Sequence, residues 1–192
     1  VQGLIQAAEA AKVIRERWGV GRGPLKGLTR RIQEEGCVVE VLDFDFPKLD
    51  GVAIGAGTSI PTVFLRAGVP TDRMRLSVAH ELGHLILHRT VHELVEEEAW
   101  AFANELMMPS DVIRAEFAHL SLDHLLRLKL KWQVSMQALL RRAQSLDMVS
   151  EREARFLWMR LSQSGFRRVE PGSDQLEPDL PSPTNQGEEG RE

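Results

Sequence analysis

The sequence contains a single cysteine and no tyrosine. One cysteine, Cys37, excludes a disulfide within the chain and any metal site built on several thiolates, and it favours a reducing compartment. We expect Cys37 to be a small buried apolar residue in a strand. Because there is no tyrosine, no phenol can stabilise a developing anion in an active site. That role is left to a metal ion, a backbone N–H, an arginine or a histidine.

Long apolar runs and a strong charge bias are also missing. No stretch approaches the ~18 consecutive apolar residues that a membrane-spanning helix needs. Residues 1–11 read as the start of an amphipathic helix, without the apolar centre of a signal peptide. We therefore expect a cytoplasmic protein with no membrane partner. The net charge of −4 argues against nucleic acid as the main partner, but seven acids and one base lie in residues 170–192, so the remainder is close to neutral.

The segment His80-Glu81-Leu82-Gly83-His84 is the most informative feature that the chain does contain. Histidines at positions i and i+4 of a helix lie on one face, so both imidazoles can reach one tetrahedral metal ion. Glu81 is offset by one residue and would stand beside the metal as a base for bound water rather than as a ligand. This arrangement suits hydrolysis of a peptide bond, which needs an activated water, a polarised carbonyl and a proton shuttle.

The surroundings of this segment predict a helix. Thr71 and Asp72 are N-cap candidates after Pro70, and apolar residues recur along one side at Met74, Val78, Leu82, Leu85 and Ile86. Gly83 costs a helix ~1 kcal/mol relative to alanine, and close approach by another backbone or by substrate would account for it. The alternative is a surface helix with two solvated histidines, which the apolar surroundings disfavour.

A catalytic zinc ion takes three protein ligands and leaves one position for water, so a third ligand is required. The candidates are the glutamates that precede a second predicted helix, namely Glu93, Glu96, Glu97 and Glu98. A short turn at 89–92 would bring this helix back beside the first one. Its packing stripe would consist of Ala99, Phe102, Ala103 and Leu106. One carboxylate would then point at the metal, and the others would be solvated near the positive end of the helix dipole.

Together, the two segments resemble the ImmA/IrrE family of zinc metallo-endopeptidases. Residues 71–89 contain the His-Glu-x-x-His helix, and residues 96–109 follow the family pattern Glu-Ala-x-x-Phe-Ala-x-x-Leu-(Leu/Met)-Met-Pro. The resemblance implies that the zinc ligands are His80, His84 and Glu98, the glutamate directly before the alanine, with Glu97 as the fallback. It also implies Glu81 as the general base.

Three further positions bear on the resemblance. His88 matches a frequent family position, where it could support a ligand, line the cleft or cap the helix C-terminus. Trp100 replaces a small polar residue, and Met107 stands where leucine is common. Neither departure removes a ligand, so both concern the shape of the cleft.

The resemblance also implies a cofactor and a substrate. Zn²⁺ is the expected cofactor, with Mn²⁺ as the alternative metal. The expected substrate is a specific protein, typically a helix-turn-helix transcriptional repressor whose cleavage switches on stress, phage or mobile-element genes. The alternative is a DNA- or protein-binding transcriptional regulator whose metal site is structural or sensory. Glu81 favours the enzyme, because a purely structural site would not need a base.

The order of the predicted elements indicates an α+β fold. Helices are expected at 2–17 and 24–35, and strands at 37–44, 52–56 and 62–66, before the motif helix and its partner. In the zincin-like arrangement that the resemblance implies, an edge strand takes up an extended substrate, and strand 62–66 is the candidate. We predict one zincin-like metallopeptidase domain, with a three-stranded sheet and flanking helices, over residues 1–115.

The chain becomes all-helical after residue 109. Ser121, Ser135 and Ser150 look like N-caps of helices over about 122–131, 135–146 and 151–163, which predicts a helix-turn-helix-like module at 116–166. DNA contact by this module stays open, because residues 121–160 hold four acids and eight bases: Arg127, Lys129, Lys131, Arg141, Arg142, Arg152, Arg155 and Arg160. Residues 167–192 are expected to form a disordered acidic tail.

Overall fold

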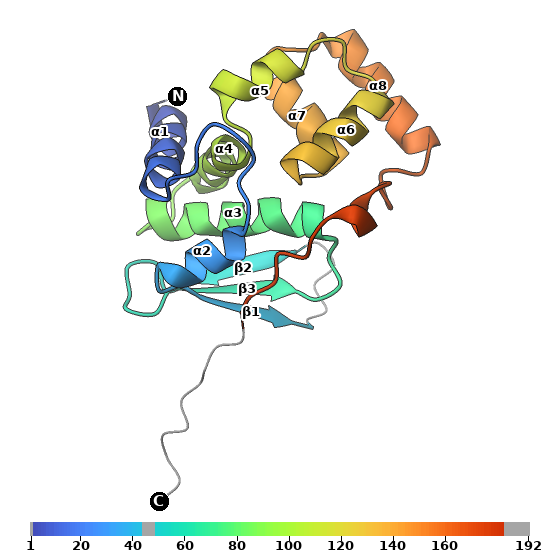
Figure 1. Cartoon of the computed structure of the whole chain (residues 1–192). Helices are drawn as coiled ribbons and strands as arrows, with labels where there is room; N and C mark the ends of the chain where they lie inside the picture. Colours follow the sequence, from blue (N-terminus) through green and yellow to red (C-terminus); the bar gives the residue numbers. More distant parts are fainter. Residues whose placement is uncertain (1, 44–48, 183–192) are drawn as a thin grey trace, which may run out of the picture.

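The computed structural model describes residues 2–43 and 49–182 and has the predicted α+β fold (Figure 1). Its elements, in chain order, are α1 (Gln2–Arg17), α2 (Leu28–Glu34), β1 (Val38–Leu42), β2 (Gly51–Ile54), β3 (Thr62–Arg66), α3 (Thr71–Leu87), α4 (Val95–Met107), α5 (Ser110–Glu116), α6 (Leu122–Trp132), α7 (Met136–Ser145), α8 (Glu151–Gln163) and η1 (Ser173–Gln175). Within the described ranges, no helix is long and apolar enough to cross a membrane.

The sheet has the strand order β1-β3-β2, with β1 parallel and β2 antiparallel to β3. The prediction that strand 62–66 forms an edge is therefore wrong, since β3 is the central strand. Val63 and Leu65 are fully buried in it, whereas Val52 and Ile54 of β2 carry exposed side chains. An apolar strand gains most from the central position, where both of its backbone edges are paired.

Helix α3 lies against the sheet. Helix α4 packs on α3, on the side away from the sheet (Figure 1). The two helices meet at Gly83: a Cβ atom there would lie 3.1 Å from Ala99 Cα and 3.2 Å from the Ala99 carbonyl oxygen. The predicted close approach of another backbone at Gly83 is thus confirmed. Only glycine lets α4 approach α3 this closely, and this contact positions the residues at the start of α4 over the histidine face of α3.

The three predicted N-caps of the helical part are confirmed. The side chains of Ser121, Ser135 and Ser150 each accept a hydrogen bond from a backbone N–H in the first turn of α6, α7 and α8. Ser150 also forms the predicted capping box with Glu153. The side chains of Thr71 and Asp72, by contrast, do not cap α3. Asp72 is buried and bonded to Lys129 instead.

The segment after α8 is packed as far as residue 182, which corrects the prediction of a disordered tail from residue 167. Figure 1 shows it returning from α8 to the sheet. Buried Glu170 accepts a hydrogen bond from Lys129 Nζ at 3.0 Å, and Lys129 also binds Asp72 at 2.6 Å. Buried Asp179 accepts from the first two N–H groups of α2 and pairs with Arg75. Buried partners for two acids order a segment whose composition suggested disorder. The rest of the predicted tail, 183–192, lies outside the described residues.

Candidate metal site and cleft

The histidine pair of α3 and one glutamate of α4 converge. His80 Nε2 and His84 Nε2 are 3.1 Å apart. One carboxylate oxygen of Glu96 lies 3.3 Å from His80 Nε2, and the other lies 3.3 Å from His84 Nε2. These three residues form a group that could hold a metal ion. The structure thus brings the two predicted histidines together with Glu96.

The spacing of these donor atoms fits a tetrahedral metal ion. Zinc binds nitrogen and oxygen ligands at ~2.0–2.2 Å, so two ligand atoms of a tetrahedral site lie about 3.4 Å apart. All three observed separations, 3.1 to 3.3 Å, are close to this value. Two histidines and one glutamate are also a ligand set of catalytic zinc, which leaves one coordination position for water or substrate.

Glu98, the predicted third ligand, lies at a different group of residues. Its carboxylate is 3.2 Å from His88 Nε2 and 3.6 Å from His92 Nε2, and these three residues form a second group with metal-ligand spacing. The geometry therefore favours Glu96 over Glu98 as the partner of His80 and His84.

The helical phase of α4 explains this difference. Successive residues of a helix are about 100° apart, so Glu96 and Glu98 flank the buried stripe of Ala99 and Phe102 on opposite sides. Glu97, the fallback, points away from that stripe and is exposed. The stripe alone could have excluded Glu97, but it could not tell which flank of α4 faces the histidine pair.

The two groups are connected through the ring of His84. Its Nδ1 atom lies 3.1 Å from His88 Nδ1, and His88 Nε2 lies within hydrogen-bond distance of Glu98. His88, for which the sequence left three roles open, is buried and bridges His84 to the carboxylate of Glu98. Chains of this kind orient a metal-binding imidazole and hold its proton on the nitrogen that faces away from the metal.

The side chain of Glu81 projects from α3 toward Gly51, the first residue of β2, next to the group of His80, His84 and Glu96. The side chain is only 8% exposed, and a Cβ atom on Gly51 would lie 3.2 Å from Glu81 Cγ. Burial raises the pKa of Glu81 to about 7, although a backbone hydrogen bond from Ala53 opposes the shift. A carboxyl group whose pKa lies near neutrality can both accept and return a proton.

The two histidines are suited to bind a cation. Burial lowers the pKa of His80 to about 4, helped by the neighbouring His84 and His88. Burial also lowers the pKa of His84. Both rings are therefore neutral at pH 7 and keep a lone pair for a metal. The exposed indole of Trp100 packs on His80, with ring centroids 4.1 Å apart, and so narrows the cleft at this point.

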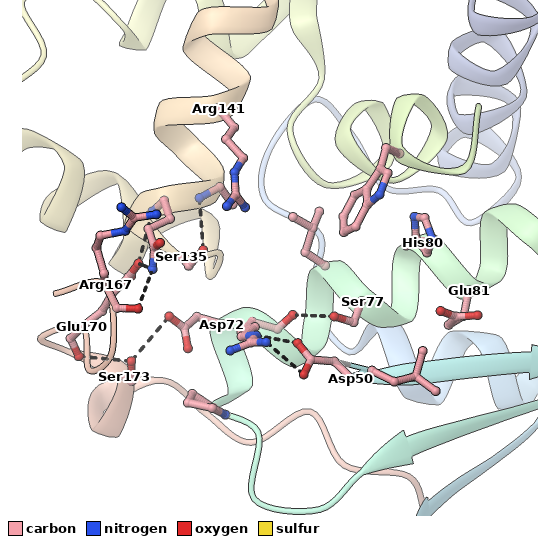
Figure 2. Close-up of a pocket in the computed structure, with 18 of the residues that line it drawn as sticks. Asp50, Asp72, Ser77, His80, Glu81, Ser135, Arg141, Arg167, Glu170 and Ser173 are labelled. Carbon is pink, nitrogen blue, oxygen red and sulfur yellow. Dashed lines mark hydrogen bonds and ion pairs between the residues drawn. The ribbon is translucent and has the colours of Figure 1, made fainter. Parts of the chain in front are cut away.

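The site opens into a cleft of about 510 Å³ that runs along α3 (Figure 2). The floor consists of one side of α3, from Asp72 to Glu81. The walls come from the start of β2, from Glu96 and Trp100 of α4, from α7, and from the returning segment 167–173. Segments from both halves of the chain thus surround one cleft, with His80 and Glu81 at one end.

An α+β fold that brings two histidines, a carboxylate as third possible ligand and a further buried glutamate together beside one cleft is characteristic of metal-dependent hydrolases. A comparison with protein families identifies a narrower group. Residues 32–144, more than half of the chain, match the peptidase M78 family, described as the IrrE N-terminal-like domain. The chain therefore belongs to this family of metallopeptidases, which confirms the predicted membership in the ImmA/IrrE family. A search of curated proteins finds no match.

Proposed function

We propose that the protein is a zinc-dependent endopeptidase whose metal is held by His80, His84 and Glu96. Manganese is the alternative metal. The main support is that three ligand atoms with tetrahedral spacing lie at the end of an open cleft, beside a buried glutamate. When bound there, zinc would lower the pKa of a water molecule and polarise the scissile carbonyl.

Glu81 is the proton carrier in this proposal. Its buried carboxylate takes the proton of the attacking water and passes it to the departing amine. Burial raises the pKa of Glu81 to about 7 in the metal-free site, and this effect of burial favours a carboxyl group that must accept and release a proton in each turnover. Contact with β2 keeps the side chain on the cleft side of α3.

His88 and Glu98 are positioning residues in this proposal. A neutral His84 that binds the metal through Nε2 carries its proton on Nδ1, and it donates this proton to His88 Nδ1 at 3.1 Å. The proton of His88 is then on Nε2, from which it is donated to Glu98. In this arrangement His88 has no lone pair left for a second ion. We therefore expect one metal ion per chain, although the group of His88, His92 and Glu98 also has metal-ligand spacing.

The substrate that we propose is a protein, with a helix-turn-helix transcriptional repressor as the leading candidate. This part of the proposal is supported by the family resemblance alone, and so are the roles in stress, phage or mobile-element gene control. The cleft supports the more general statement, because it is open and extends along α3 from Glu81 to Asp72.

The alternative, a DNA-binding regulator, is less well supported. Two bases of the helical part are buried in ion pairs: Lys129 with Asp72, and Arg142 with Glu105. Arg141 of α7, the first helix of the expected helix-turn-helix, lines the cleft.

Four glutamine variants test the proposal. Glu81→Gln should retain one zinc ion and lose cleavage of the candidate repressor by ~10²-fold or more. Glu96→Gln should lose zinc, and Glu98→Gln should weaken zinc binding by roughly 10–100-fold, as removal of a supporting partner does. Glu97→Gln, exposed on the same helix, is the matched control. Zinc affinity is measured by competition with a chromogenic chelator, and cleavage by mass spectrometry.

Two results would contradict parts of this scheme. Cleavage at the wild-type rate by Glu81→Gln would show that Glu81 is not the general base. Loss of zinc in Glu98→Gln but not in Glu96→Gln would show that Glu98, and not Glu96, is the third ligand.

A further inference from the structure

We propose that the end of the cleft away from the histidine pair is a subsite for an acidic side chain of the substrate. The inference rests on the proposed function, because it concerns the peptide that crosses the same cleft. Three arginines line this end: Arg141 from α7, and Arg167 and Arg168 from the returning segment. Figure 2 shows Arg141 and Arg167 on the side of the cleft opposite Glu81.

These arginines have no carboxylate partner among the described residues. Three of the five acids that line the same cleft are already paired with cations. Asp50 binds Arg73 at 2.5 Å and also Arg66. Asp72 and Glu170 share the buried Lys129, as described above. Within the described part of the chain, no carboxylate oxygen lies within 4.0 Å of Arg141, Arg167 or Arg168.

The fold holds two of the arginines in place. The guanidinium carbons of Arg141 and Arg167 lie 5.6 and 5.8 Å from the ring centroid of Trp158. The segment that carries Arg167 is fastened to α7, because Glu170 accepts hydrogen bonds from the backbone N–H groups of Met136 and Gln137. A guanidinium group that lies over an aromatic ring keeps N–H groups available, and these match the two oxygens of a carboxylate.

The opposite charges at the two ends of the cleft would orient a bound peptide. Glu81 and Glu96 lie at one end, and the three arginines lie at the other. A peptide that crosses the histidine pair and continues along α3 gains a charge-assisted contact if it carries aspartate or glutamate several residues from the scissile bond. We expect such a residue to improve kcat/KM roughly tenfold or more, the equivalent of one hydrogen bond to a charged group.

A cleavage experiment with the whole zinc-loaded chain of 192 residues tests this subsite. The substrate is a library of proteome-derived peptides, and the cut sites are mapped by mass spectrometry. The wild type should cut peptides enriched in Asp or Glu at a constant distance from the cut. Arg141→Gln/Arg167→Gln should lose this enrichment but still cut neutral peptides. Arg127→Gln, an exposed arginine of α6 outside the cleft, is the control and should match the wild type.

A binding experiment separates failure of the subsite from failure of the proposed function. A fluorescent peptide with several glutamates and its all-glutamine counterpart are titrated by anisotropy into the wild type and the double variant. The glutamate peptide should bind the wild type roughly tenfold more tightly, and the double variant should lose this preference. Equal affinities in the wild type would overturn the subsite, whether or not the protein cleaves peptides.

A single-stranded oligonucleotide serves as the competitor, since phosphates could use the same arginines. If the oligonucleotide binds more tightly than the glutamate peptide, and loses affinity in the double variant, the ligand is nucleic acid and the peptide subsite is refuted.

Discussion

Replacing Gly83 with alanine should weaken both the fold and the metal site. The added Cβ would lie 3.1 Å from Ala99 Cα, 3.2 Å from the Ala99 carbonyl oxygen and 3.3 Å from Phe102 Cδ1, all tighter than ordinary van der Waals contact. Two of these three atoms are backbone, so α4 itself has to move by a few tenths of an ångström. The start of α4 carries Glu96, whose carboxylate moves with it.

The expected magnitude comes from two opposing effects. Alanine favours the helix by ~1 kcal/mol over glycine. Overpacking of a tight helix contact costs about 1–3 kcal/mol. The free energy of unfolding of Gly83→Ala should therefore fall by about 0–2 kcal/mol rather than rise. Zinc affinity should fall roughly tenfold, comparable to the loss of a supporting partner at a metal site.

Urea unfolding of the metal-free protein and chelator competition for zinc measure the two effects separately. Gly21→Ala is the control, because a Cβ atom there meets nothing within 4 Å. It should keep wild-type zinc affinity and leave stability unchanged or raise it by up to ~1 kcal/mol. Ala99→Gly should not rescue Gly83→Ala, since the contacts at Ala99 are with backbone atoms. A gain of ~1 kcal/mol in Gly83→Ala, with zinc affinity unchanged, would refute the close contact of the two helices.

Two further predictions concern buried charges. Because the pKa of Glu81 is about 7 in the fold and 4.5 without it, the folded metal-free protein binds this proton more tightly, and its stability falls as pH rises through this window. In urea unfolding, the free energy of unfolding of Glu81→Gln should increase relative to that of the wild type between pH 4.5 and 7, by up to ~1.4 kcal/mol per pH unit. Parallel curves of unfolding free energy against pH for the two proteins would refute the burial of Glu81. Lys129→Met should lose ~3–5 kcal/mol in the same assay, because it leaves Asp72 and Glu170 buried without a cation. Exposed Lys131→Met should cost at most ~1 kcal/mol, and equal losses would contradict the buried triad.

Some features of the site follow from the sequence alone. The repeat of a helix places His80 and His84 on one face and Glu81 beside them, whatever surrounds the helix. A glycine between the histidines predicted a close neighbour, and the Ala99 backbone is that neighbour. The three serine N-caps were also predictable, because capping depends on only four successive residues. The shared helix face and the N-caps are local properties, set by hydrogen bonds within a single element.

Features that depend on contacts between distant elements were predicted less well. The packing stripe of α4 leaves Glu96 and Glu98 equivalent, one on each flank, and only the crossing of α4 over α3 turns Glu96 toward the histidine pair. Strand β3 is central because β1 pairs directly with it and not with β2, which lies between them in the sequence, and such long-range pairing is not fixed within any one strand.

The returning segment depends most strongly on tertiary structure. Its composition predicts disorder, yet Glu170 and Asp179 are buried against Lys129 and Arg75, partners 41 and 104 residues away in the chain. A carboxylate is tolerated inside a protein only where the fold supplies a cation or free N–H groups, and nothing near it in the sequence reveals that supply. The sequence by itself thus determined the chemistry of the HExxH helix. The tertiary structure decided which carboxylate joins it and which charges line the cleft, because both depend on how separate elements pack.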